Sequence, residues 1–195
     1  MGLQTAAESL RNQIVSAALQ LFLEKGYHST SLQDIITAAN CSKGGFYHHF
    51  ASKDDLLYLI HETFITYELE RGEAVRSQPG PAAERLRQVI VDLVESIALY
   101  RPHVTVFFEE RRSLSSEKFA LVKQKRDRYE ALVRELVEEG MRSGEFRQDL
   151  DPRIVTFAIF GMCNWTYQWL RPDGPLTPRQ VGEMFSSLIL QGLRS

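Results

Sequence analysis

The sequence predicts an all-α protein in which a three-helix, helix-turn-helix domain is followed by a larger helical domain. Apolar residues recur at helical spacing through most of the chain, and no segment shows the alternation of a β-strand. Residues 31–53 have the pattern of two short helices joined by a tight corner. Start signals such as Asp151-Pro152 and Thr177-Pro178 divide the remainder, so we expect about nine helices in all.

The first helix is expected over residues 8–25 and ends at Gly26, a residue typical of the position after a helix. Its apolar positions fall on one stripe. They are Leu10, Ile14, Ala17, Ala18, Leu21 and Phe22. This helix supplies much of the predicted core of the first domain, together with Leu32, Ile35, Phe46 and Phe50.

Residues 31–53 carry the helix-turn-helix. Thr30 or Ser31 can cap the first of its helices, with Gln33 or Asp34 placed to complete a capping box. Asn40 tolerates the left-handed conformation that a tight corner needs. Ser42 then caps a second helix over residues 43–49, the element that would enter a DNA major groove by its N-terminal residues.

This stretch resembles the DNA-binding domain of TetR-family repressors. The likeness is carried by Ile35, Ala39, the run Cys41-Ser42-Lys43-Gly44, and the positions that follow it. Those positions are Phe46, Tyr47, His49, Phe50, Lys53 and Leu56. Asn40-Cys41 stands where Gly-Val is common in the family and Ile36 where Ala is common, but both substitutions keep a corner-tolerant residue and an apolar neighbour.

The resemblance implies which residues contact DNA. Lys43 is expected at a base edge, since lysine can donate to guanine O6 and N7, and Gly44 and Gly45 would allow close approach to the groove. The contacts expected at phosphates, which fix register without reading sequence, are Tyr47, His48, Lys53 and Thr30. The full expected DNA-binding set is Thr30, Ser42, Lys43, Gly44, Gly45, Tyr47, His48 and Lys53. For His49 a hydrogen bond inside the domain is an equal alternative.

The domain boundary is expected inside a long helix that begins after Ser52 and runs toward Arg76, so no flexible linker is predicted. The DNA-binding domain would comprise residues 1–57 and a helical effector-binding and dimerisation domain residues 58–195. Further helices are expected over residues 82–100, 103–112, 117–142, 152–170 and 178–193.

The last two of these helices predict a homodimer. Residues 154–170 are apolar on nearly all sides, so this helix should be buried on more than one side. TetR-like proteins pair through their last two helices, and two recognition helices about 34–36 Å apart would read a palindromic operator. The alternative is a monomer with an unusually apolar core.

An effector site is expected among the helices of the second domain. The candidate residues are Phe107, Phe108, Arg111, Asn164, Trp165, Gln168 and Trp169. A plain aromatic core is the alternative for the rings, and a solvated charged face is the alternative for an anion-binding cluster of Arg101, His103, Arg111 and Arg112. Residues 161–175 resemble TetR-like regulators of fatty-acid and steroid catabolism, which implies an acyl-CoA-like effector.

Composition limits the classes of function. A net charge of −2 excludes a basic polyelectrolyte, and four basic against three acidic residues leave only +1 over residues 1–53. Two cysteines without Cys/His clusters predict neither a disulfide framework nor a metal site, and no apolar run reaches the roughly 18 residues of a membrane span. We therefore expect a cytoplasmic repressor without a cofactor, and not an enzyme. A transcriptional activator or a helical protein-interaction adaptor are the alternatives.

Overall fold

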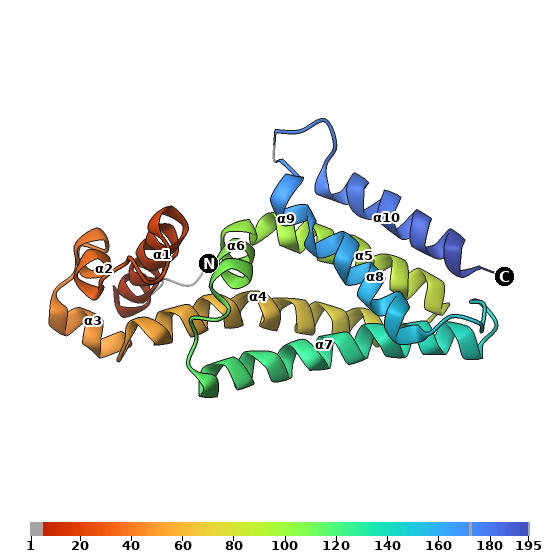
Figure 1. The fold of residues 1–195 in the computed structure, drawn as a ribbon, viewed down its shortest axis with the longest axis horizontal. Helices are drawn as coiled ribbons and strands as arrows, with labels where there is room; N and C mark the ends of the chain where they lie inside the picture. Colours follow the sequence, from red (N-terminus) through yellow and green to blue (C-terminus); the bar gives the residue numbers. More distant parts are fainter. Residues whose placement is uncertain (1–5, 172, 195) are drawn as a thin grey trace. The chain divides into compact units, whose positions relative to one another are not determined.

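The structure is a computed structural model that describes residues 6–171 and 173–194 (Figure 1). Over these residues it is helical throughout, with no strand, which confirms the predicted fold class. The helices before the loop at residues 77–81 are α1 (Ala6–Lys25), α2 (Leu32–Ala38), α3 (Lys43–His49) and α4 (Lys53–Arg76). Those after it are α5 (Ala82–Leu99), α6 (Arg101–Glu110), α7 (Ser116–Arg142), α8 (Pro152–Asn164), α9 (Thr166–Trp169) and α10 (Pro178–Leu193).

One expected helix is divided. The segment predicted as a single helix over residues 152–170 is interrupted at Trp165, so the described chain has ten helices instead of about nine. The hydroxyl group of Thr166 donates to the carbonyl oxygen of Cys163 at 2.6 Å, a side-chain bond that competes with the regular helical ladder at this point. The short helix α9 then ends at Leu170.

The chain divides into two compact units. The first unit holds the chain up to Phe64 together with Pro102–Val122, and the second holds Ile65–Arg101 and the chain from Lys123 onward. Helices α4 and α7 each continue from one unit into the other. The predicted domain boundary near residue 58 stays a prediction, but no sequence pattern had indicated that residues 102–122 pack with the first unit.

The first unit is organised around the inward face of α1 and the two helices of the helix-turn-helix. Ile14, Ile35 and Phe46 are completely buried, and Phe22 and Phe50 nearly so. Leu21 and Leu32, also predicted for this core, are only half-buried.

The second unit is organised around α5, which packs against α8, α9 and α10. The apolar residues on its inward face are all buried, namely Leu86, Val89, Ile90, Leu93, Val94 and Ile97. Gly182 brings α10 very close to α5, because a Cβ atom at this position would lie 2.8 Å from the Cα atom of Val91. Within the described residues, no helix is both long enough and apolar enough to cross a membrane.

Candidate functional site

The first helix of the helix-turn-helix begins with the predicted capping box. The Ser31 hydroxyl oxygen accepts from the Asp34 backbone N–H at 3.1 Å, and the Asp34 carboxylate accepts from the Ser31 N–H at 2.9 Å. The backbone hydrogen bond from Ser31, with a further bond from Lys25, lowers the pKa of Asp34 to about 2. This box fixes the start of α2 at physiological pH, where Asp34 is ionised.

The corner between α2 and α3 has the predicted geometry. Asn40 has a φ of 48°, and no other non-glycine residue of the described chain has a positive φ. The backbone N–H of Ala39 donates to the Ile35 carbonyl at 2.8 Å and that of Cys41 to the Ile36 carbonyl at 3.1 Å, so the ladder of α2 continues up to the turn. Asparagine is one of the few residues that adopt this conformation at low cost.

Helix α3 presents its N-terminal turn to solvent. The Ser42 hydroxyl oxygen accepts from the Gly45 N–H at 3.0 Å and caps the helix. Lys43, Gly44 and His48 are exposed, and Tyr47 is 49% exposed although it is a large aromatic residue. On the opposite side Phe46 is fully buried, which confirms its assignment to the core.

The two glycines of α3 have different surroundings. A Cβ atom on Gly44 would meet nothing closer than 3.9 Å, so this position is open toward solvent. A Cβ atom on Gly45 would lie 3.3 Å from the Ser42 hydroxyl oxygen and 3.4 Å from a methyl group of Leu10. Gly44 therefore suits close approach to DNA, whereas Gly45 allows α3 to lie close to α1.

Thr30 does not lie where a phosphate contact requires it. Its side chain is only 1% exposed, and its hydroxyl group lies within hydrogen-bonding distance of the Gly26 carbonyl at 2.8 Å and the Leu21 carbonyl at 3.3 Å. The sequence-based assignment of Thr30 is therefore corrected: its hydroxyl group closes the end of α1 and is not available at the surface.

Lys53 is also engaged inside the first unit. Its ammonium group donates to the carbonyl oxygens of Tyr27 at 2.6 Å and Thr30 at 2.7 Å, and lies 4.1 Å from the centre of the Tyr27 ring. Burial lowers the pKa of Lys53. An ammonium group has three donors, so one remains for a phosphate after these two bonds.

The two adjacent histidines are placed differently. His48 is exposed and His49 half-buried, and their rings meet edge-on with centres 4.9 Å apart. His49 also lies beside Phe50, with ring centres at 6.5 Å. His49 is thus placed against the domain, whereas His48 is accessible at the surface of α3.

The predicted effector residues fall into separate groups. Phe107, Phe108 and Arg111 belong to the first unit, where Phe107 is buried edge-on against Phe108 and Arg111 is exposed. The other four belong to the second unit and lie in the segment from the end of α8 through α9. They are Asn164, Trp165, Gln168 and Trp169.

The second group is largely on the surface. Trp165 is 61% and Trp169 45% exposed, Gln168 is exposed, and Asn164 is half-buried. Arg101, expected in an anion-binding cluster, instead donates to the carbonyl oxygens of Tyr167 and Leu170 at 3.1 Å each and so holds α9. Burial lowers the pKa of His103, another member of that cluster.

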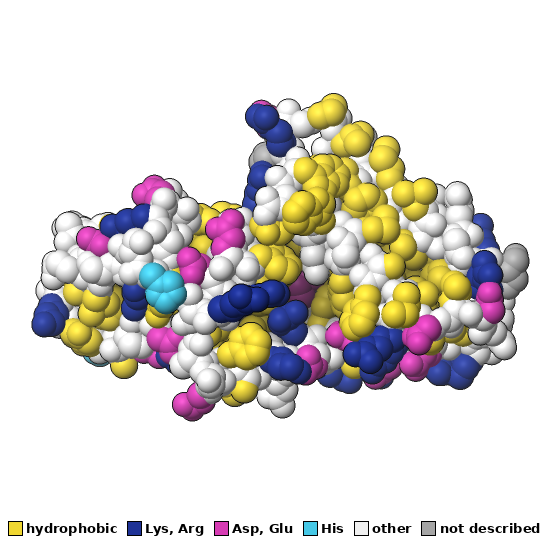
Figure 2. Space-filling view, in the orientation of Figure 1, with side chains coloured by type: hydrophobic (Ala, Val, Ile, Leu, Met, Phe, Trp, Pro, Cys, Tyr) yellow, Lys and Arg dark blue, Asp and Glu magenta, His cyan; other side chains and the backbone are white. Residues whose placement is uncertain are grey.

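The exposed tryptophans are part of a larger apolar surface on α8, α9 and α10. Figure 2 shows hydrophobic side chains gathered over these helices, here called the α8–α10 face. Its large exposed members are Ile154, Phe157, Trp165, Trp169, Met184 and Leu188. An apolar surface of this kind marks an interaction site in a folded protein.

The sequence interpretation missed a buried polar cluster in the second unit. Glu68 from α4 is 3% exposed and shares hydrogen bonds with Ser96 from α5 and Tyr129 from α7. Burial, only partly offset by these hydrogen bonds, raises the pKa of Glu68 to about 7. The Tyr129 ring packs closely against α4 because residue 72 is glycine. A Cβ atom at that position would lie only 2.8 Å from the ring.

A second carboxylate and a thiol lie near this cluster. Asp92 is buried beside it and pairs with Arg71 at 2.8 Å, while the thiol of Cys163 lies on the side of α8. Burial, together with the Glu68 carboxylate, raises the pKa of Cys163 to about 12. The thiol therefore stays protonated at neutral pH, and neither Cys163 nor Cys41 forms a disulfide.

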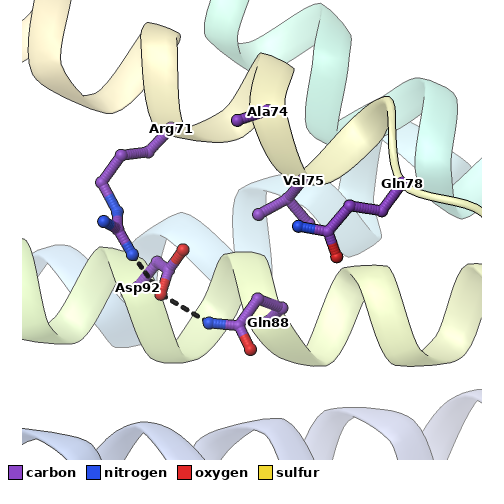
Figure 3. A pocket seen from close by; sticks show the side chains of 6 residues that line it. All are labelled: Arg71, Ala74, Val75, Gln78, Gln88 and Asp92. Atoms are coloured by element: carbon purple, nitrogen blue, oxygen red, sulfur yellow. Dashed lines mark hydrogen bonds and ion pairs between the residues drawn. The ribbon is translucent and has the colours of Figure 1, made fainter.

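The Arg71–Asp92 pair also borders a pocket of the second unit, with a volume of about 260 Å³ (Figure 3). Asp92 accepts a second hydrogen bond from Gln88 at 2.6 Å. The pocket is lined by Arg71, Ala74, Val75, Gln78, Gln88 and Asp92. The two charged side chains of its lining, Arg71 and Asp92, form an ion pair with each other, so neither charge is left unpaired in the pocket.

Comparison with known proteins agrees with this geometry. Residues 14–58 match the family model of bacterial regulatory proteins of the tetR family, and residues 79–193 match that of the tetracyclin repressor-like C-terminal domain. The transcriptional repressor KstR2 of Mycobacterium tuberculosis is 27% identical over 186 residues, which cover 95% of this chain and 93% of KstR2. Its structure superposes with a TM-score of 0.87.

Two further solved structures are similar over almost their full length. The TetR-family regulator PfmR of Thermus thermophilus is 33% identical, with a TM-score of 0.85, over 93% of this chain and 99% of PfmR. AibR in complex with isovaleryl coenzyme A and operator DNA is 26% identical, with a TM-score of 0.80, over 92% of this chain and 97% of AibR. The helix-turn-helix geometry and the two matched family models identify this chain as a DNA-binding transcriptional regulator, not an enzyme, that belongs to the TetR family.

Proposed function

We propose that this chain is a cytoplasmic repressor that binds a palindromic operator as a homodimer and is released by an acyl-CoA thioester. The observation that carries the DNA-binding half is the exposed, capped N-terminal turn of α3 behind a corner fixed by Asn40. In a helix-turn-helix, this turn is the part that reaches the base edges in the major groove.

Within α3, Lys43 is the residue proposed to read a base, because its side chain is exposed at the first position of the helix. Gly44 leaves space for the close approach. Tyr47 and His48 are proposed to bind phosphates, as is the remaining N–H of Lys53. Ser42 contributes by capping the helix whose N-terminus faces the DNA.

The proposed dimer forms through helices α8 and α10, which carry most of the α8–α10 face. A single short recognition helix gives little specificity, whereas two copies about one helical turn apart on the DNA read both halves of a palindrome. A second copy of this chain would cover the exposed apolar side chains of α8 and α10, such as Ile154 and Leu188. An isologous contact of this kind places the two copies of α3 symmetrically.

The effector is proposed to bind in the second unit and to favour a conformation with lower operator affinity. An effector can shift that equilibrium only through a difference in its affinity for the two conformations. Two observations support a CoA thioester: AibR was crystallised with isovaleryl coenzyme A, and the sequence of residues 161–175 resembles acyl-CoA-responsive regulators. Asn164, Trp165, Gln168 and Trp169 are the proposed contacts in this unit. Phe107, Phe108 and Arg111 belong to the first unit and stay sequence-based predictions.

The test begins with selection of an operator from random DNA by the intact protein. Fluorescence anisotropy then compares the wild type with Lys43→Ala, and with Lys123→Ala as a control that removes an exposed lysine from the second unit. Lys43→Ala should weaken binding by roughly tenfold to a hundredfold, while Lys123→Ala should not. Equal binding by all three proteins would contradict the proposed DNA contact.

Effector release is tested separately with the same operator. Isovaleryl-CoA and longer acyl-CoA thioesters are titrated into the protein–DNA complex, with free coenzyme A as the control. Release by thioesters but not by free coenzyme A is the expected result. An unchanged operator affinity across the series would contradict the effector assignment and leave DNA binding intact.

A further inference from the structure

The segment 102–122 belongs to the same compact unit as the helix-turn-helix, although residues 54–101 separate the two along the chain. It contains most of α6, the turn after it and the first residues of α7. Here we call residues 110–118 the α6–α7 corner. All the contacts described below lie within this one unit.

Glu110, the last residue of α6, binds the loop between α1 and α2. One oxygen of its carboxylate accepts from the backbone N–H of Tyr27 at 2.9 Å. Gly26, with a φ of +80°, makes this approach possible, because a Cβ atom there would lie only 3.3 Å from the same oxygen. The other Glu110 oxygen accepts from the Ser113 hydroxyl at 2.9 Å, and that hydroxyl also contacts His28 at 3.0 Å.

The α6–α7 corner makes a second attachment at the start of α4. The backbone N–H of Ser115 donates to Asp54 at 3.2 Å. The ammonium group of Lys118 lies 3.0 Å from the Asp54 carboxylate and also binds Asp55. Two sites on the corner are thus bonded to two separate parts of the helix-turn-helix domain.

Side chains thus bind both the N–H and the carbonyl groups of the α1–α2 loop. Glu110 accepts a hydrogen bond from the N–H of Tyr27, while Lys53 donates to the carbonyl oxygens of Tyr27 and Thr30. The next residue, Ser31, is the N-cap of α2, which runs without a flexible link into the Asn40 corner and α3. A displacement of the loop would consequently displace the recognition helix.

We propose that Glu110 is a positioning residue for operator binding and that the α6–α7 corner holds α3 in the arrangement that fits the DNA. The inference rests on the proposed function, because it assigns a role toward the operator to residues that do not touch it. Glu110 is half-buried and acts through the loop, so it adds no contact to a phosphate or a base.

The decisive comparison is among Glu110→Ala, Glu110→Gln and Glu109→Ala in the full-length protein. Alanine removes the acceptor of the Tyr27 N–H and should weaken binding to the selected operator by roughly tenfold. Glutamine keeps an amide oxygen for that N–H and should restore most of the affinity. Glu109 is exposed on the same helix, and Glu109→Ala controls for the loss of one negative charge.

The salt dependence separates positioning from direct contact. A variant that loses a phosphate contact lowers the slope of log K against log salt, whereas Glu110→Ala should lower affinity at every salt concentration with the slope unchanged. Lys118→Ala breaks the second attachment without altering Glu110 and should act in the same direction. If circular dichroism shows that Glu110→Ala does not fold, the operator affinity of Lys118→Ala alone tests whether the α6–α7 corner positions α3.

The outcomes distinguish this inference from the proposed function. Wild-type affinity in the corner variants, with binding lost in Lys43→Ala, would overturn the positioning role and keep the operator-binding assignment. Wild-type affinity in Lys43→Ala as well would show that the proposed DNA contact itself is wrong. Loss of affinity in Glu110→Ala that Glu110→Gln fails to restore would also overturn the role of the Tyr27 hydrogen bond.

Discussion

The buried carboxyl group of Glu68 should make the stability of this protein depend on pH. Burial raises its pKa from 4.5 to about 7 in the folded chain, whereas the unfolded chain leaves it at the ordinary value. Between these two values the folded protein holds a proton that the unfolded chain has released. The contribution of the protonated Glu68 side chain to the free energy of unfolding is therefore fully present below about pH 4.5. It is lost as the pH rises through about 7.

The magnitude follows from the two pKa values. A difference of about 2.5 pH units between 4.5 and about 7 corresponds to about 3 kcal/mol, at about 1.4 kcal/mol per unit. Glu68→Gln cannot ionise but keeps an acceptor for Ser96 and Tyr129. Its free energy of unfolding relative to wild type should rise by about 3 kcal/mol between pH 4.5 and pH 8, equivalent to roughly 6–12 °C in melting temperature.

Scanning calorimetry of the full-length proteins across this pH range provides the assay. Glu70→Gln removes the same charge from the exposed face of α4 and is the matched control. The difference between Glu68→Gln and wild type should grow with pH and level off above about pH 7. Melting curves of Glu68→Gln and wild type that shift in parallel at every pH would refute the reasoning.

Three further changes test the packing around the functional surfaces. Leu188→Glu places a charge on the α8–α10 face and should shift the protein from dimer to monomer in sedimentation velocity, whereas Leu121→Glu in the first unit should leave the dimer intact; equal behaviour of the two would argue against this face. Gly182→Ala forces a Cβ atom to 2.8 Å from the Val91 backbone and should lower the free energy of unfolding by about 1–3 kcal/mol, measured by urea titration, so an unchanged midpoint would show that α10 and α5 can separate freely. Ser31→Ala removes the capping box of α2 and should cost about 1 kcal/mol in the same titration, and no loss would mean that another group caps the helix.

The helix-turn-helix could be predicted from the sequence because its signals are local. The Ser31 and Ser42 caps, the Asn40 corner and the buried Phe46 each act within a few residues of chain, and the structure places all of them as expected. The interruption at Trp165 could not be predicted in the same way. It falls inside an otherwise continuous apolar pattern, which carries no local signal for a break.

The features that the sequence did not reveal depend on distant partners. Thr30 is a polar residue of a type common at surfaces, but it is buried and its hydroxyl group donates to a carbonyl group at the end of α1. Glu110 has the pattern of a solvated charge, and its bond to Tyr27 spans 83 residues. Glu68 was also missed, although a local signal was present: it falls four residues after Phe64 on the buried face of α4, where a charged residue is unusual.

Hydroxyl-radical footprinting of the intact protein on its selected operator shows whether two copies of α3 read a palindrome. Two symmetric protected half-sites are expected, about one helical turn apart on one face of the DNA, and both should be weakened by Lys43→Ala. A single protected site, or a footprint that Lys43→Ala leaves unchanged, would contradict that expectation.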